Sequence, residues 1–213
     1  MRNDIERLGP MEIERRSFEI ISREASGRIP DDERAMIIKR VIHTTADFDY
    51  LDNLCFSEGA VGHALDALQK GAWIVTDTNM ALSGINKPSL KKAGCEAFCF
   101  MADEDVAQKA RMLGVTRASV CVDKAAACSH PLIYAVGNAP TALIRLYELI
   151  QDGKISPELV IGVPVGFVNV VQSKELIMQT GIPYIVARGR KGGSNVAACI
   201  CNALLYMLDG SRD

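Results

Sequence analysis

Residues 132–151 of the chain read LIYAVGNAPTALIRLYELIQ. The first five are apolar without a break, which is typical of a strand buried on both faces of a parallel sheet. The polar turn Gly137-Asn138-Ala139-Pro140 follows, and residues 141–151 have the pattern of a helix. This one stretch predicts a strand, a turn and a helix in succession, which is the repeating unit of an α/β fold.

The same unit recurs along the chain from Ala72 onward. The predicted strands cover residues 73–76, 97–100, 132–136, 159–163 and 184–187, and the predicted helices cover residues 103–113, 117–128, 141–151, 173–180 and 195–208. Several of these helices end at a glycine, namely Gly114, Gly153 and Gly181. We therefore expect an α/β protein, a three-layer α/β/α sandwich with a doubly wound parallel sheet of about five strands. The first 70 residues are helical in pattern, so helices should precede the sheet.

Length and composition narrow the class of protein. The chain has 213 residues, of which 48% are hydrophobic and 23% charged, and its net charge is -2. These values favour a single domain over residues 1–213 and argue against disorder and against nucleic acid as a partner. Neither a signal core nor an apolar run of about 20 residues occurs, so we expect no membrane association and a cytoplasmic location, with a frayed tail at 209–213.

The cysteines and the glycine motifs argue against several cofactors. The seven cysteines include no C-x-x-C pair, so they are predicted to be reduced core residues, and we expect no metal site. Neither a P-loop nor a G-x-G-x-x-G follows the first predicted strand. No nucleotide is therefore specifically indicated.

In a doubly wound sheet the ligand binds beyond the carboxyl ends of the strands. The turn after the last predicted strand, residues 188–194, reads RGRKGGS, and we call it the basic loop. Its glycines allow backbone N–H groups to approach a ligand, and its basic side chains and the following helix start add positive charge. Anion binding and a merely solvated basic turn are both compatible with this loop taken alone.

Two side chains in the N-terminal helical section are further candidates. His43 lies where an apolar helix runs into the polar residues Thr44, Thr45 and Asp47, so its imidazole is placed at an edge, where it can transfer protons near neutral pH. If the helix continued for another turn, Asp47 could orient the ring. Ser17 lies on an apolar stripe with Ile13, where it either bonds back to its own helix or contacts a ligand.

Five stretches together resemble the precorrin-8X methylmutase family of corrin biosynthesis. They are Glu14–Ile21, Ile42-His43, Gly137–Leu143, Gly162–Val168 and Arg188–Ser194, and the resemblance runs from about Glu12 to Leu208. It implies a flavodoxin-like fold and an isomerase that moves a methyl group from carbon 11 to carbon 12 of a tetrapyrrole. It also implies that no cofactor is needed and that the enzyme is a homodimer.

The resemblance also implies roles for individual residues. The histidine that matches His43 donates and accepts a proton at a ring nitrogen, and the serine that matches Ser17 helps to bind the substrate. Further donors for the carboxylate arms of this polyanion are expected at Arg117, Asn138, Thr141, Arg188, Lys191, Gly192, Gly193 and Ser194. The sequence leaves open whether the substrate is precorrin-8X or cobalt-precorrin-8. A non-catalytic tetrapyrrole-binding module and a flavodoxin-like nucleotide-binding module remain as alternatives.

Overall fold

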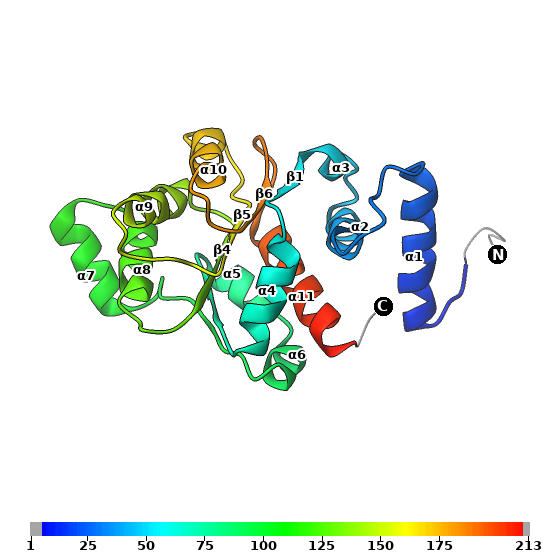
Figure 1. Cartoon of the computed structure of the whole chain (residues 1–213), viewed down its shortest axis with the longest axis horizontal. Coiled ribbons are helices and arrows are strands. Elements are labelled where there is room, and N and C mark those ends of the chain that lie inside the picture. The colour runs from blue at the N-terminus through cyan, green and yellow to red at the C-terminus, as the bar shows by residue number, and fades with distance from the viewer. Residues whose placement is uncertain (1–5, 211–213) are drawn as a thin grey trace.

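The computed structural model describes residues 6–210, which form a six-stranded sheet with helices on both faces (Figure 1). The strands are β1 Leu54–Phe56, β2 Trp73–Thr76, β3 Ala97–Phe98, β4 Leu132–Val136, β5 Leu159–Gly162 and β6 Tyr184–Ala187. Their order across the sheet is β1-β6-β5-β4-β2-β3. Strands β2 to β6 run parallel, whereas β1 pairs antiparallel with β6.

All five predicted strands are present, but the expected sheet of five parallel strands is corrected to six strands with an antiparallel edge. The additional strand β1 has only three residues, and it lies within the section that was predicted to be helical. Strand β3 ends at Phe98 rather than at residue 100. Edge strands this short carry too few residues for a period to be recognised, so their pairing depends on the tertiary fold.

Helices occupy most of the remaining chain. They are α1 Pro10–Glu24, α2 Arg34–Thr45, α3 Tyr50–Asn53, α4 Ala60–Gln69, α5 Asn79–Gly84, α6 Lys87–Lys92, α7 Glu104–Leu113, α8 Arg117–Ala126, α9 Pro140–Gln151, α10 Val170–Met178 and α11 Ser194–Asp209. The short helices α5 and α6 were not predicted, and α10 begins before the predicted start at residue 173. Of the tail predicted to fray, residues 209–213, Asp209 is still helical as the last residue of α11, and residues 211–213 lie outside the described residues.

Alternate residues of the buried strands face opposite layers, as the two sides of a strand require. In β4, Ile133 and Ala135 pack into the core shared with α2, α4 and α11. Leu132, Tyr134 and Val136 pack into the core shared with α8, α9 and α10. These two cores on either side of one sheet confirm the three layers, which Figure 1 shows with α8, α9 and α10 on one side and α4 and α11 on the other.

The strand order reverses between β2 and β4, because β3 lies on one side of β2 and every later strand lies on the other. At such a reversal, the loops that follow the two adjacent parallel strands diverge. A crevice forms between these loops at the carboxyl edge of the sheet. The turns after β2, β4, β5 and β6 all leave from this edge. The basic loop follows β6, so it lies where a ligand is expected.

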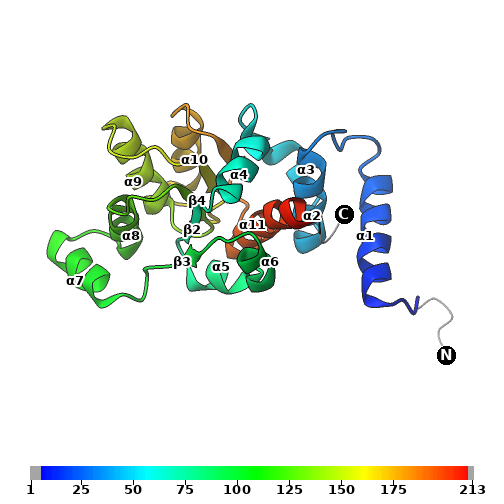
Figure 2. The same ribbon diagram turned by 60° about the horizontal axis from the view of Figure 1, so that its bottom comes forward.

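The N-terminal helix stands at one end of the molecule. Helix α1 packs against α2, and α2 in turn packs against α11. Figure 2 shows α1 beyond α2, at the end opposite α7 and α8. None of the described helices combines the length and the apolar character that crossing a bilayer would require.

Candidate active site

His43 lies near the carboxyl end of α2, as the sequence predicts. The helix ends at Thr45, and Ala46 adopts a left-handed conformation with φ 53°. The His43 side chain is exposed, and its ring meets Phe18 of α1 edge to face, with 5.6 Å between the ring centroids. The imidazole is therefore open to solvent on one side and held by an aromatic ring on another.

A groove of about 350 Å³ runs past His43 between α2 and α11. Its lining consists of Glu14, Arg40, His43, Thr44, Gly84, Asn195, Ala198, Cys199, Asn202 and Tyr206. The hydroxyl of Thr44 donates to Sγ of Cys199 over 3.1 Å, which ties the end of α2 to α11. The groove therefore combines the histidine with the start of the helix that follows the basic loop.

Arg40 forms the wall of the groove one helical turn before His43. The side chain is only 8% exposed, and its Nη2 lies 2.8 Å from a carboxylate oxygen of Glu14. Its guanidinium also lies over the rings of Phe18, at 5.3 Å, and Tyr206, at 4.7 Å. This cluster joins α1, α2 and α11, and it holds the ring that contacts His43. A helix-borne arginine looks like a surface residue in a sequence, so this role was not predicted.

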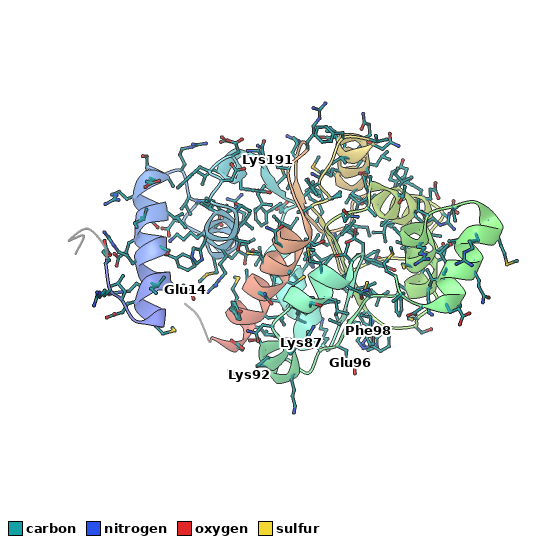
Figure 3. The ribbon with its side chains drawn as sticks, turned by 180° about the vertical axis from the view of Figure 1, so that it is seen from behind. Glu14, Lys87, Lys92, Glu96, Phe98 and Lys191 are labelled. Atoms are coloured by element: carbon teal, nitrogen blue, oxygen red, sulfur yellow. The ribbon has the colours of Figure 1, made fainter. Side chains whose placement is uncertain are left out.

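Asp47 does not have the orienting role that a longer α2 would have allowed. The helix ends before it, and its carboxylate accepts a hydrogen bond from Nζ of Lys191 over 2.6 Å. Lys191 also donates to Asp49 over 2.6 Å. The bond from Lys191 lowers the pKa of the Asp47 carboxyl and raises that of the Lys191 ammonium. The pair brings the turn after α2 against the basic loop, and Figure 3 labels Lys191 and Glu14 on either side of α2.

The basic loop is packed tightly onto the loop that follows β5. The N–H of Gly193 donates to the carbonyl of Val163 over 2.8 Å, and the N–H of Gly166 donates to the carbonyl of Arg190 over 3.2 Å. A Cβ atom at Gly192 would lie 2.1 Å from the carbonyl oxygen of Val163, so this position has no room for a side chain. Gly192 is therefore required for the close packing of the two loops, in addition to any role in binding.

The backbone N–H groups of the turn after β4 already have an acceptor within the protein. The Asp77 carboxylate, at the end of β2, accepts the N–H groups of Gly137, Asn138 and Ala139 at 2.8, 2.8 and 2.7 Å. Burial raises the pKa of the Asp77 carboxyl, and these three donors oppose part of the rise. A ligand can therefore use only the exposed side chain of Asn138. The sequence placed Asp77 at a strand exit but gave no sign that it would organise the neighbouring turn.

Two predicted serines have hydrogen-bond partners within the protein. Ser194 begins α11, and its hydroxyl pairs with that of Thr78 over 2.7 Å. Ser17 donates to the carbonyl of Ile13 over 2.8 Å, which is the local bond considered for it. The expectation that Ser17 lies in a buried apolar stripe is wrong in part, because Ile13 is 52% exposed.

Arg117 and Thr141 lie far from His43 within one chain. Arg117 is exposed at the start of α8, beside Thr116, whose hydroxyl pairs with that of Thr141 over 2.8 Å. Figure 1 places α8 and α1 toward opposite ends of the longest dimension of the molecule. The structure therefore brings His43 and the basic loop together but does not bring Arg117 to them.

Within residues 6–210, the other histidines, cysteines and acidic side chains form no second candidate site. The Nε2 atom of His130 pairs with the carbonyl of Gly71 over 2.9 Å, and its ring stacks on Trp73. Across residues 6–210, no three histidine, cysteine or acidic side chains are grouped so that they could hold a metal ion. The cysteines of this part of the chain are all free thiols.

The fold is a doubly wound α/β fold, and at the carboxyl edge of its sheet an exposed imidazole lies near a basic loop, an arrangement that suits an α/β enzyme with an anionic substrate. Residues 12–207 match the family model described as precorrin-8X methylmutase. The chain belongs to the precorrin-8X methylmutase family, which is a family of isomerases.

Individual relatives agree with this assignment. The chain is 48% identical to the cobalt-precorrin-8 methylmutase of Salmonella typhimurium, covering 93% of this chain and 96% of that protein. It is 38% identical to the precorrin-8X methylmutase of Pseudomonas aeruginosa, covering 90% and 93%. The crystal structure of precorrin-8X methylmutase from Thermus thermophilus matches with a TM-score of 0.84 and 37% identity, covering 94% of this chain and 99% of that one. These matches give no support to a nucleotide-binding or a non-catalytic module.

Proposed function

We propose that this chain moves a methyl group from carbon 11 to carbon 12 of precorrin-8X or cobalt-precorrin-8, giving hydrogenobyrinate or cobyrinate. The observation that carries the proposal is the exposed His43 imidazole in a groove beside the basic loop, in a chain of this family. The Salmonella relative has the cobalt-substrate name, as does a Leptospira interrogans relative at 43% identity, so cobalt-precorrin-8 is the first substrate to test.

His43 is the proposed proton donor and acceptor. An imidazole that protonates a ring nitrogen draws electron density from the conjugated macrocycle, which favours migration of the methyl group to the adjacent carbon. The same nitrogen returns the proton once the methyl group has moved, so the residue ends the cycle unchanged. General acid catalysis of this kind contributes about 10²- to 10⁴-fold to a rate. The edge contact with Phe18 restricts the ring and supports its orientation.

The basic loop is the proposed binding site for a carboxylate arm of the substrate. Among residues 6–210, the N–H groups of Arg190, Lys191 and Gly192 have no protein acceptor. The first turn of α11, which begins at Ser194 directly after Gly193, adds further unpaired N–H groups and the positive end of a long helix. Arg188 and Lys191 add charge, although each already pairs with a carboxylate of the protein. We propose that their positive charge attracts the substrate while the backbone donors hold it.

Ser17 and Arg117 can serve one substrate only if two chains combine. They lie toward opposite ends of the chain, on α1 and α8 (Figure 2). We propose a homodimer in which Arg117 of one copy, with Thr141 near it, approaches the His43 groove of the other. The apolar side chains Leu8, Met11 and Ile13 on or beside α1 are 37%, 67% and 52% exposed, which supports burial of this surface by a second copy.

Four broader features complete the proposal. The chain acts as one domain, and it works in the cytoplasm. The five parallel strands, taken without β1, form a flavodoxin-like core, because their order β3-β2-β4-β5-β6 is the order known for that fold. The proposed enzyme needs neither a methyl donor nor a redox cofactor, since the methyl group moves within one molecule.

The test replaces the imidazole and leaves its surroundings in place. His43→Asn and His43→Ala are assayed with cobalt-precorrin-8 and with precorrin-8X, and the corrin chromophore is followed by its visible spectrum. We expect kcat to fall by about 10²-fold or more while substrate still binds. The control is His63→Asn, which changes a histidine of α4 outside the groove. Normal turnover in the His43 variants would refute the catalytic assignment, and binding without turnover by the unaltered protein would indicate a binding module.

A further inference from the structure

Lys174 is a buried lysine beneath the basic loop. It lies on α10, its residue is 0% exposed, and its Nζ donates to the carbonyl of Gly189 over 2.8 Å and to that of Lys191 over 2.9 Å. Burial lowers the pKa of the Lys174 ammonium to about 8. None of the described carboxylates lies within ion-pair distance of it. A buried ammonium is unfavourable unless its donors are satisfied, and here two carbonyls of the basic loop satisfy it.

Because the peptide bond is planar, the two contacts of Lys174 with carbonyl groups also determine the direction of two N–H groups. A trans peptide is planar, so its C=O and N–H bonds point in opposite directions. The described residues contain no cis peptide. The carbonyl of Gly189 shares a peptide with the N–H of Arg190, and the carbonyl of Lys191 shares one with the N–H of Gly192. Lys174 draws both carbonyls inward, and it therefore turns both N–H groups away from the protein interior.

The two donors are held in place and remain available. The carbonyl of Arg190 accepts the N–H of Gly166, and the N–H of Gly193 donates to Val163, so the loop is fixed on both sides of the two peptides. Within the described part of the chain, neither the Arg190 N–H nor the Gly192 N–H has an acceptor. The ammonium behind the carbonyls also polarises both peptides, which strengthens their N–H groups as donors.

We propose that Lys174 is a positioning residue that aims the N–H groups of Arg190 and Gly192 at one carboxylate of the substrate. It does not touch the substrate. This proposal rests on the proposed binding of a carboxylate arm at the basic loop, and it identifies the donors and the side chain that orients them. A methionine of similar length would fill the same space, but it would orient neither peptide.

The charge of Lys174 provides a readout that a purely structural role would not give. The elements packed against α10 are α9, β5 and β6. The titratable and charged groups of these elements, of α10 and of the basic loop are Arg145, Tyr147, Glu148, Glu175, Tyr184, Arg188, Arg190 and Lys191. Burial alone, and none of these groups, causes the low pKa of Lys174. Affinity for a carboxylate should therefore fall as the pH rises through about 8, because the ammonium then loses its proton.

The experiment measures binding of the corrin product, hydrogenobyrinate, by visible absorbance, together with KM and kcat for turnover. Lys174→Met is compared with Ser173→Ala, an equally buried neighbour whose hydroxyl bonds only within its own helix, to Val170. Arg190→Pro is compared with Arg190→Ala, and this pair isolates the N–H of Arg190 because proline has none. We expect Lys174→Met to raise Kd and KM about 10-fold or more and to change kcat less. The loss of affinity between pH 7 and pH 9 should disappear in this variant.

The outcomes distinguish the positioning role of Lys174 from the carboxylate site at the basic loop. Weaker binding in Lys174→Met with Ser173→Ala normal, together with weaker binding in Arg190→Pro than in Arg190→Ala, supports the positioning role. Weaker binding in Arg190→Pro alone retains the carboxylate site and overturns the role of Lys174. A Lys174→Met protein that melts earlier but binds the product with unchanged affinity and an unchanged pH profile also overturns it. If neither variant alters binding, the carboxylate site at the basic loop is wrong as well.

Discussion

Gly192→Ala tests whether the packing of the basic loop depends on the absence of a side chain. The new Cβ would lie 2.1 Å from the carbonyl oxygen of Val163, 2.7 Å from its carbonyl carbon and 2.9 Å from the carbonyl oxygen of Pro164. All three are backbone atoms, which cannot swing aside as a flexible side chain could. The loops after β5 and β6 must therefore separate, and the Gly193 N–H to Val163 bond of 2.8 Å is lost or lengthened.

The size of the effect follows from three contributions. Overpacking costs about 1–3 kcal/mol, loss of the hydrogen bond about 0.5–1.5 kcal/mol, and an alanine at φ 157° about 1–3 kcal/mol. A total near 5 kcal/mol is expected, which corresponds to a fall in Tm of about 10–20 °C in a chain of this size. The matched control is Gly189→Ala in the same loop, at φ 81° with no atom within 4 Å of the new Cβ. It should cost about 1–2 kcal/mol, from backbone conformation alone.

Urea and thermal unfolding of the two variants, followed by circular dichroism, give the comparison. The steric argument requires Gly192→Ala to be the less stable protein by about 2 kcal/mol or more. Equal losses of stability in the two variants would refute it, because they share a positive φ and differ in the contact with Val163. Product binding should also weaken in Gly192→Ala, since the separated loops no longer present the same N–H groups.

Two further predictions concern charge pairs of the site. Glu14→Gln removes the negative charge beside the buried Arg40 guanidinium but keeps a hydrogen-bond acceptor, so urea unfolding should show a loss of about 2 kcal/mol of stability. The control is Glu19→Gln, at an exposed position of the same helix, which should change stability by less than about 0.5 kcal/mol. Equal effects of the two substitutions would contradict the buried pair. Lys191 lowers the pKa of Asp47, so the stabilisation from this pair is present above the unfolded pKa of about 3.9 and is lost as the pH falls through the lower folded pKa. The acid-unfolding curve of Lys191→Met should lack this pH-dependent loss of stability. A variant whose stability is lower by the same amount at every pH would contradict the assignment.

The sheet and its layers could be predicted from the sequence because buried parallel strands have a strong local signal. The run of residues 132–136 is apolar on both faces, and the structure places alternate members of it in two different cores. Strand β1 lacked such a signal, since it has three residues and exists through its pairing with β6. Local pattern is informative where burial is complete, and it fails where a long-range partner determines the structure.

The candidate site likewise combines features with a local sequence signal and features that depend on long-range partners. The position of His43 at the end of a helix could be predicted, because the helix pattern and the polar turn are both local. The partners of charged residues could not be predicted in this way. The pairs of Lys191 with Asp47 and Asp49 were not predicted, and Lys174 resembles a surface lysine of a helix but is fully buried. Such roles depend on which loops meet at the edge of the sheet.

The groove beside His43 has a consequence for how the enzyme is made. Apart from Gly84, its lining comes from residues 14–44, which form an N-terminal wall, and from residues 195–206, so the two ends of the polypeptide supply most of it. A ribosome releases the N-terminal wall first, and the sheet strands follow before α11 is complete. A nascent or prematurely terminated chain that lacks α11 therefore has the histidine but no groove. On the proposed function, the substrate site is completed only when synthesis is nearly finished, and a chain without the last helix is expected to have no activity rather than reduced activity.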